Sequence, residues 1–410
     1  MMTILYHLAF FLFALGYLPV FFLKKKSVDH FRERFGVLPK NSVPAGKRVL
    51  WLHAVSLGEA LASVPLIQEV RKAFPDIHFS FSTTTRTGRT VLEGVRKKDE
   101  LLFYFPLDLG WVVRRVIRTV RPVLFATMET EIWPNLLLTL KKENVRVALL
   151  NGRISDKSFR WYDRVRWALS APLQSVDRFG MQSTEDAERI QKLGADPSKV
   201  RILGNMKFDL VTPRSGDVSV SGIRDRLGLG EEEKLWIAGS THPGEETLLL
   251  ESYIALSKEF PTLRLLIAPR HPERKGEVAA LVHSFKKEIH SEVLILDTVG
   301  ELRSLYAAAD FVFIGGSLVP KGGQNLLEPA FFGKPILFGP HMENFKDITR
   351  LFLNEKAAVQ VRGREDLIAA SRRFLSDVSL GKDYGEKAKR VLFENQGVVG
   401  RYLVLLKELL

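Results

Sequence analysis

The chain of 410 residues contains no cysteine. Disulfide bonds, cysteine-ligated zinc, iron–sulfur clusters and a thiol nucleophile are therefore excluded. Several enzyme signatures are also missing: D-x-D, H-E-x-x-H, G-x-S-x-G, the P-loop lysine pattern and the G-x-G-x-x-G spacing. These absences argue against a metal-bound sugar diphosphate, a zinc protease, an α/β-hydrolase, a P-loop nucleotide hydrolase and an NAD-binding Rossmann domain.

Acidic residues are scarce in one half of the chain only. Residues 1–210 hold 33 Lys and Arg against 20 Asp and Glu, a net charge of +13, whereas residues 211–410 hold 27 of each. An anionic partner is therefore expected to meet the N-terminal half. Nucleic acid is disfavoured as that partner because the sequence contains no recognisable nucleic-acid-binding motif.

One long hydrophobic run stands at the start of the chain. Residues 3–23 carry no formal charge over 21 positions, and about 1.5 Å per residue makes such a helix just long enough for a hydrocarbon core of roughly 30 Å. Lys24, Lys25 and Lys26 follow, which by the positive-inside rule predicts that the rest of the chain is cytoplasmic. A cleaved signal peptide fits less well, because no basic segment precedes the run. We expect residues 1–26 to hold the protein at the membrane, either by spanning it or by lying on its surface.

After the anchor, short apolar runs alternate with amphipathic stretches, a pattern that predicts parallel strands flanked by helices. The runs of the first set are 48–53, 77–82, 101–106, 123–127, 145–151, 179–183 and 200–204. Those of the second set are 235–240, 263–269, 293–297, 311–316, 335–339 and 357–361. Two doubly wound α/β domains joined near 205–220 are the expected result, with ligands bound at the carboxyl ends of the strands in the cleft between them.

Charged residues follow three strands of the first domain. Glu59 comes after the first strand at the start of a helix, Glu129 and Glu131 follow the strand 123–127, and Arg153 follows the next strand. A carboxylate at a helix start is often only a cap that stabilises the helix dipole by about 0.3–1 kcal/mol. The position of Glu59 at a strand end also suits a general base.

Glycine-rich loops mark the second domain. The pairs Gly315–Gly316 and Gly322–Gly323 are expected to let backbone N–H groups approach an anion, and Asn325 is expected to start a helix whose N-terminus holds a phosphate. Glu328, one turn later, is placed to accept hydrogen bonds from ribose hydroxyls. The pattern is typical of a nucleotide-sugar site. His53, His242 and His271 are expected in strand-end loops, where loop hydrogen bonding is a simpler role than metal ligation.

Seven motifs in fixed order carry a family resemblance: HAVSLGE (53–59), METEIWPN (128–135), NGRIS (151–155), GNMKFD (204–209), GSTHPGEE (239–246), PRHPER (269–274) and GGQNLLEP (322–329). Together they resemble the 3-deoxy-D-manno-octulosonic acid (Kdo) transferases of lipopolysaccharide synthesis. The resemblance implies the GT-B glycosyltransferase fold, with two Rossmann-like α/β domains facing across a cleft and an N-terminal membrane-anchor helix. It also implies transfer of Kdo from CMP-Kdo to a lipid A precursor at the cytoplasmic face of a Gram-negative inner membrane.

The resemblance divides the chain into four parts: the anchor (1–26), an acceptor-binding domain (27–210), a CMP-Kdo-binding domain (211–385) and a C-terminal helix (386–410) expected to pack back toward the N-terminal domain. It assigns Glu59 as general base, and Glu129 and Lys207 as groups that stabilise the transition state. The donor-binding residues that it implies are Pro269, Arg270, Gly300, Glu301, Leu302, Asn325, Leu326, Leu327 and Glu328.

Two positions leave the assignment open. Gln324 stands where many family members have His, which weakens any role for an imidazole there, and Glu131 competes with Glu129 for the second acidic role. The resemblance implies no cofactor and no catalytic metal. The alternatives are another GT-B enzyme that uses a UDP-sugar, either a transferase or an epimerase, and a non-catalytic membrane-tethered protein that binds anions.

Overall fold

The structure is a computed structural model that describes residues 31–39, 43, 44, 46–211, 219–289 and 292–410. The expected anchor at 1–26 lies outside the described residues. Among the helices that the structure does describe, none has the length and apolar character needed to cross a membrane. The chain forms two compact units. Unit 1 contains the described residues up to Leu210 together with Gly397–Leu410, and unit 2 contains Val211–Gln396.

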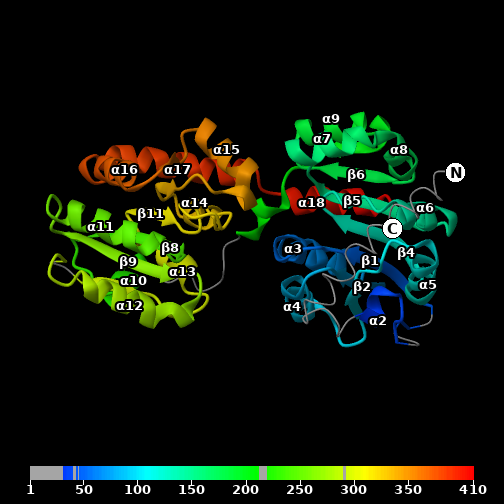
Figure 1. Cartoon of the computed structure of the whole chain (residues 1–410), viewed down its shortest axis with the longest axis horizontal. Helices are drawn as coiled ribbons and strands as arrows, with labels where there is room; N and C mark the ends of the chain where they lie inside the picture. The colour runs from blue at the N-terminus through cyan, green and yellow to red at the C-terminus, as the bar shows by residue number, and fades with distance from the viewer. Residues whose placement is uncertain (1–30, 40–42, 45, 212–218, 290–291) are drawn as a thin grey trace. The chain divides into compact units, whose positions relative to one another are not determined.

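Unit 1 is built on a seven-stranded parallel sheet with the order β3-β2-β1-β4-β5-β6-β7 (Figure 1). Its strands are β1 (Arg48–His53), β2 (Ile77–Thr83), β3 (Leu101–Tyr104), β4 (Pro122–Met128), β5 (Arg146–Gly152), β6 (Arg178–Met181) and β7 (Val200–Ile202). Its helices are α2 (Phe31–Arg34), α3 (Leu57–Ala73), α4 (Arg86–Val95), α5 (Gly110–Val120), α6 (Pro134–Lys142), α7 (Asp156–Arg164), α8 (Arg166–Gln174), α9 (Thr184–Lys192) and α18 (Val398–Lys407), with the 3-10 helices η2 (Pro197–Lys199) and η3 (Met206–Leu210). Each predicted run of the first set overlaps one strand.

The central strands of unit 1 are buried on both faces, which explains why their sequences are continuous apolar runs without alternation. Successive side chains of β1 point to opposite faces of the sheet. Trp51 joins one hydrophobic cluster with Phe103 and Phe125, while Leu50 and Leu52 join a second cluster on the other face. Helices therefore cover both faces of this sheet, and the ends of the strands are left for the loops.

Unit 2 is built on a six-stranded parallel sheet with the order β10-β9-β8-β11-β12-β13. Its strands are β8 (Lys234–Thr241), β9 (Leu263–Pro269), β10 (Val293–Ile295), β11 (Phe311–Ile314), β12 (Ile336–Phe338) and β13 (Val359–Gln360). Its helices are α10 (Val220–Arg226), α11 (Glu245–Ser257), α12 (Lys275–Ser284), α13 (Leu302–Leu305), α14 (Leu327–Phe331), α15 (Lys346–Asn354), α16 (Arg364–Ser376) and α17 (Val378–Glu394), with the 3-10 helices η4 (Pro272–Arg274), η5 (Tyr306–Ala308) and η6 (Glu343–Phe345). Each predicted run of the second set also overlaps one strand.

The C-terminal segment differs from the expectation of one helix over 386–410. Helix α17 ends at Glu394 and belongs to unit 2, and the chain enters unit 1 at Gly397 before α18 begins. Gly397 takes a left-handed φ of 77°, a conformation that glycine adopts at little cost. In Figure 1 the red helix α18 accordingly lies among the blue and green elements of unit 1.

Helix α18 is an integral part of unit 1. It packs against α3 and η3, and the buried hydroxyl of Tyr402 donates to the carbonyl oxygens of Gly180 at 3.0 Å and Gly204 at 3.2 Å. The carboxylate of Asp209 accepts hydrogen bonds from the N–H groups of Gly397 at 2.8 Å and Val399 at 2.6 Å. Asp209 thus satisfies N–H groups that a helix starting at glycine leaves without a side-chain cap.

Both sheets reverse their strand order at one place. In unit 1 the reversal lies between β1 and β4, and in unit 2 between β8 and β11. Doubly wound sheets bind ligands at such switch points, outside the carboxyl ends of the strands. The loops after these four strands are therefore where functional residues are sought.

Candidate active site

Glu59 lies at the switch point of unit 1, in the first turn of α3. Ser56 is the N-cap of the helix, and its hydroxyl accepts a hydrogen bond from the N–H of Glu59 at 3.3 Å. The Glu59 carboxylate in turn accepts from the Ser56 hydroxyl at 2.8 Å and from the N–H of Val55 at 2.8 Å. This reciprocal arrangement is close to a capping box. Glu59 therefore does cap its helix, and the same contacts fix its carboxylate in one orientation.

The environment of Glu59 favours its protonated form. Burial raises the pKa of the carboxyl to about 8, and the charge of Glu129 adds to the rise, followed by a smaller contribution from Glu131. The hydrogen bonds from Val55 and Ser56 act in the opposite direction. A pKa near the working pH is the property expected of a general base, because the carboxylate then has appreciable basicity while a useful fraction is ionised.

Glu129 and Glu131 occupy the loop on the other side of the same switch point, after β4. Glu129 adopts a left-handed φ of 56°, which is uncommon for a residue other than glycine, and its N–H donates to the carbonyl of Leu150 at 2.8 Å. Glu131 accepts a hydrogen bond from the indole nitrogen of Trp133 at 2.8 Å, and burial raises its pKa to about 7. The structure thus brings the predicted acidic residues of two loops into one electrostatically coupled cluster.

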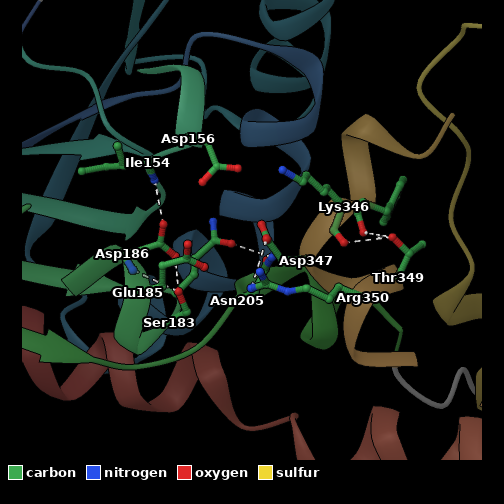
Figure 2. Close-up of polar contacts among 12 residues, drawn as sticks. Ile154, Asp156, Ser183, Glu185, Asp186, Asn205, Lys346, Asp347, Thr349 and Arg350 are labelled. Atoms are coloured by element: carbon green, nitrogen blue, oxygen red, sulfur yellow. Dashed lines mark hydrogen bonds and ion pairs between the residues drawn. The ribbon is translucent and has the colours of Figure 1, made fainter. Parts of the chain in front are cut away.

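The loop after β5 is fastened to that cluster. The hydroxyl of Thr130 donates to the carbonyl of Arg153 at 2.6 Å and accepts from the N–H of Arg153 at 3.0 Å. The next residue, Ile154, donates its N–H to Asp186 at 2.8 Å, and Ser183 donates its hydroxyl to the same carboxylate at 2.5 Å (Figure 2). The backbone of Arg153 is therefore tied to the loop that carries Glu129 and Glu131.

Lys207 lies on η3, which packs against α3, the helix that carries Glu59. The preceding residue, Met206, is buried in the hydrophobic cluster that contains Ala60, and its N–H donates to the side chain of Asn151 at 2.9 Å. The N–H of Lys207 donates to the side chain of Asn205 at 2.9 Å. The predicted catalytic residues of the first domain are therefore carried by elements that meet in unit 1.

His53 does not lie in a loop, contrary to the expectation. It is the last residue of β1, is fully buried, and stacks on Phe105 with ring centroids 3.8 Å apart. Its Nδ1 lies 3.1 Å from the carbonyl of Ser82, and burial lowers its pKa to about 3. The imidazole is thus neutral at ordinary pH and is part of the packing beneath the site.

Unit 2 gathers basic side chains at its switch point. His242 directly follows β8, and its pKa is lowered by burial first and then by His271, Lys321 and Arg270. The rings of His242 and His271 lie with centroids 6.1 Å apart, and the N–H of Arg270 donates to the carbonyl of Thr241 at 2.9 Å. Lys321 and Arg270 supply positive charge at this switch point, although the carboxylate of Glu246 acts on His242 as well. Lysine and arginine side chains suit an anionic ligand.

Of these residues, the sequence had pointed only to Arg270 for the donor. His242 and Lys321 were missed because they meet only when β8 and β11 are neighbours, and the order of strands in a sheet is not visible in the hydrophobic pattern. Gln324 also lies near His242, with its amide nitrogen 3.5 Å from Nε2 of the imidazole. An imidazole is therefore present at this point of the fold, supplied by a different loop from the one that carries Gln324.

The expectation that Gly315, Gly316 and Gly323 offer N–H groups to an anion is wrong. Gly315 donates to the carbonyl of Gly239 at 2.8 Å, and Gly323 donates to the carbonyl of Gly316 at 2.8 Å. Gly316 donates to the carboxylate of Glu245 at 2.7 Å. Glycine is needed at 315 for space, since a Cβ there would lie 2.2 Å from the carbonyl oxygen of Ser240.

The segment 325–328 is arranged differently from the prediction. Helix α14 begins at Leu327, two residues after the expected start, and Asn325 forms a turn in which its side chain accepts from the N–H of Leu327 at 3.0 Å. The Asn325 amide donates to Glu328 at 3.2 Å. Leu326 and Leu327 are fully buried. Only the backbone of these two leucines is therefore suited to contact a ligand.

The remaining predicted donor residues occupy two strand ends. Pro269 is the buried last residue of β9. Gly300, with φ 91°, and Glu301 precede α13, which begins at Leu302. Glu301 forms an ion pair with Arg226 at 3.2 Å, so its carboxylate is already engaged.

Across the described ranges, no group of three or more His, Asp or Glu side chains has the geometry of a metal site.

Solved structures of low sequence identity share this architecture. A glycosyltransferase from Rickettsia africae matches with a TM-score of 0.58 and 15% identity, covering 89% of this chain and 99% of that one. The UDP-GlcNAc 2-epimerase of Neisseria meningitidis matches with a TM-score of 0.59 and 12% identity, covering 87% and 99%. Similarities at this level of identity show the fold alone. They place the chain in the class of two-domain Rossmann-like proteins with GT-B-like architecture.

Sequence comparison then narrows the class. The family model described as 3-Deoxy-D-manno-octulosonic-acid transferase (kdotransferase) matches residues 29–210. The 3-deoxy-D-manno-octulosonic acid transferase of Haemophilus influenzae is 33% identical over 388 residues, covering 92% of this chain and 90% of the relative. A probable mitochondrial 3-deoxy-D-manno-octulosonic acid transferase of Arabidopsis thaliana is 30% identical and covers 89% and 86%. The chain belongs to the Kdo transferase family and is a glycosyltransferase.

Proposed function

We propose that this transferase moves Kdo from CMP-Kdo to a hydroxyl of a lipid A precursor, lipid IVA, with inversion at the anomeric carbon. Family membership supports the sugar that is transferred. The single observation that carries the mechanism is the buried Glu59 carboxyl, which is fixed by Val55 and Ser56 and has a pKa of about 8. A carboxylate with these properties at a sheet switch point is suited to take a proton from an acceptor hydroxyl.

The chemical step balances without a further reactant. The bond between the anomeric carbon and the phosphate oxygen of CMP-Kdo breaks, and CMP leaves with the electron pair. The acceptor oxygen attacks the opposite face of the sugar and forms the new bond, while its proton passes to Glu59. Positive charge develops on the sugar ring as CMP departs, and Glu129 is suited to stabilise it. Lys207 is suited to balance the charge of the departing phosphate.

Unit 2 is proposed to bind the donor. The basic residues near His242, among them Arg270 and Lys321, match the single phosphate of CMP. Glu328, already bonded to Asn325, is suited to accept a ribose hydroxyl. The other donor contacts carried over from the family are backbone or side-chain contacts of Pro269, Gly300, Glu301, Leu302, Asn325, Leu326 and Leu327.

The proposed mechanism needs no metal ion. A CMP-sugar leaves as a nucleoside monophosphate, which carries less charge than a nucleoside diphosphate. Arginine and lysine side chains can stabilise that charge, because charge-assisted hydrogen bonds to phosphate are stronger than hydrogen bonds between neutral groups. We therefore expect transfer to persist in the presence of a chelator.

The proposed location is the cytoplasmic face of a bacterial inner membrane, with residues 1–26 as the anchor. The charge distribution supports this location, since the net +13 lies wholly within residues 1–210. Anionic lipids attract a basic surface by about 1 kcal/mol per well-placed Lys or Arg. The lipid A precursor carries phosphates as well, so one positive half would serve both membrane and acceptor.

The test is to incubate the purified full-length protein with CMP-Kdo and tetraacylated lipid A precursor and to analyse the products by mass spectrometry. Formation of a Kdo-lipid product supports the proposal, and the mass counts the sugars added. A thermal-shift comparison of CMP with UDP separates the alternatives. Stabilisation by UDP alone would favour a UDP-sugar enzyme, and lipid binding without any product would favour a non-catalytic protein.

A further inference from the structure

The loops after β8 and β11 are far apart in the sequence but meet at the switch point of unit 2. The first loop carries His242 and the second carries Gln324, and their side-chain nitrogens lie 3.5 Å apart. The strands are parallel neighbours, with Ile314 paired to Gly239. After β8 the chain turns at once into α11, whereas after β11 it runs through a long loop before α14. The spacing of His242 from Gln324 therefore depends on what fastens the two loops to each other.

One side chain fastens both loops. Glu245 is the first residue of α11 and is fully buried. Its Oε2 accepts hydrogen bonds from the N–H groups of His242 at 2.9 Å and Gly316 at 2.7 Å. Its Oε1 accepts from the N–H groups of Ser317 at 2.9 Å and Leu318 at 2.9 Å. One carboxylate thus binds one N–H of the first loop and three successive N–H groups of the second.

These contacts determine where the ligand-facing groups stand. Gly316 takes φ 67°, and a Cβ placed there would lie 3.1 Å from Cδ2 of His242 and 3.5 Å from the amide nitrogen of Gln324. Gly316 is thus packed directly against both side chains. If the Gly316 backbone moved away from Glu245, the packing of His242 and Gln324 against it would change.

We propose that Glu245 is a positioning residue for donor binding, which holds the His242 loop and the 316–324 loop in the spacing that the nucleotide phosphate requires. This inference rests on the proposed function of unit 2 as the donor site. Glu245 does not contact the donor itself, since its two oxygens are occupied by backbone N–H groups. It fills, from within the protein, the concave row of N–H groups that would otherwise attract an anion.

The neighbouring Glu246 provides a matched control. It is equally buried and lies on the same turn of α11, but its partners are the side chains of Thr241 at 2.9 Å and Arg274 at 2.8 Å, not loop N–H groups. Glu245→Gln and Glu246→Gln both replace a buried carboxyl by an isosteric amide. Both variants are expected to lower the melting temperature. Only Glu245→Gln places an NH₂ group against the N–H donors of the two loops.

The experiment measures CMP affinity by calorimetry and the KM for CMP-Kdo and for the lipid acceptor in the full-length protein. Glu245→Gln is expected to raise the CMP dissociation constant and the donor KM about tenfold, the scale of a lost charge-assisted hydrogen bond, with the acceptor KM unchanged. Glu246→Gln is expected to raise the donor KM less than Glu245→Gln does, because the contacts that it changes are with Thr241 and Arg274 and not with the loop N–H groups. If Glu245→Gln does not fold, Glu245→Asp, which retains the charge on a shorter stem, is measured in its place and is expected to raise the donor KM too.

Three outcomes would overturn the inference: an unchanged donor KM in a folded Glu245 variant, equal effects of the two substitutions, or a fall in kcat alone that reflects fewer active molecules. Failure of the proposed function is a separate result. In that case the wild-type protein itself would neither bind CMP nor form product.

Discussion

The two units share a topology but gather different ionisable side chains at the same structural position. In unit 1 the loops after β1 and β4 bring together Glu59, Glu129 and Glu131, with the pKa of Glu59 raised by burial to about 8. In unit 2 the equivalent loops after β8 and β11 bring Lys321 near His242, beside Arg270 from the adjacent strand end, and the pKa of the histidine is lowered. The doubly wound sheet fixes where side chains converge, and the loop sequences decide which chemistry they perform.

This contrast is the reverse of the overall charge distribution. Unit 1 lies in the half of the chain with the net charge of +13, yet its switch point is acidic, and the neutral half has the basic switch point. Overall charge therefore indicates which partners approach a domain, whereas a few buried groups define its chemistry. The following experiments test the contrast, from the largest expected effect to the smallest.

Glu59→Gln is expected to lower kcat by about 10²–10⁴-fold, because it removes the proposed general base while keeping the shape of the side chain. CMP binding, which is proposed to belong to unit 2, should stay unchanged. Steady-state kinetics and calorimetry check the two halves of this prediction. Glu69→Gln is the control, since Glu69 is an exposed residue of the same helix, paired with Lys72. Wild-type turnover in the Glu59 variant would exclude Glu59 as the general base.

Arg270→Ala is expected to raise the KM for CMP-Kdo about tenfold with a smaller effect on kcat, because an exposed guanidinium contributes mainly to binding the phosphate. The effect should shrink as salt is added. Arg372→Ala serves as control, because Arg372 is an exposed residue of unit 2 that pairs with Glu259 at 2.7 Å. A donor KM equal to that of the wild type at low salt would contradict the basic character proposed for this switch point.

Tyr402→Phe is expected to lower the free energy of unfolding of unit 1 by about 1 kcal/mol, because the buried carbonyls of Gly180 and Gly204 lose a donor. Urea denaturation followed by tryptophan fluorescence measures the change. Tyr384→Phe, on a half-buried tyrosine of unit 2 that packs on Phe374, should have a smaller effect. Equal effects would mean that α18 contributes no more to unit 1 than an ordinary helix surface contributes to unit 2.

Glu131→Gln is expected to shift the pH dependence of kcat/KM modestly. A base with a raised pKa makes the rate rise with pH, with a midpoint near pH 8 for Glu59. Removing the negative charge of Glu131, the smallest of the contributions to that pKa, should lower the midpoint by less than about one pH unit. Glu129 contributes more, so Glu129→Gln should shift the midpoint further. A shift to higher pH would show that the acidic cluster does not act on Glu59 as described.

Much of the architecture was visible in the sequence, for a physical reason. Strands buried on both faces are mostly apolar, so runs such as 48–53 and 263–269 mark them clearly. Glu59 and Glu129 were correctly expected after the ends of two strands, Glu59 in the first turn of the following helix and Glu129 directly after β4. Their roles in catalysis stay predictions.

What the sequence did not reveal depends on contacts between distant loops. The N–H of Gly316 was expected to face a ligand, but it donates to Glu245, which is 71 positions away. The residues that surround His242 likewise depend on which strands are neighbours in the sheet. The break between α17 and α18 was missed because a single left-handed glycine, Gly397, is enough to redirect the chain. Hydrophobic periodicity reports burial, and it carries no information about such partners.

The return of the chain to unit 1 has a consequence for biosynthesis. Unit 2 is continuous in sequence from Val211 to Gln396, whereas the hydrophobic cluster of unit 1 is completed by Val398, Tyr402 and Leu405. During translation, unit 2 can therefore finish folding while unit 1 still lacks a helix, although most of unit 1 was synthesised first. A premature stop in the last fourteen residues would leave unit 2 whole and expose apolar surface on unit 1, which carries Glu59. Unit 1 therefore keeps part of its hydrophobic cluster uncovered until α18 has been translated.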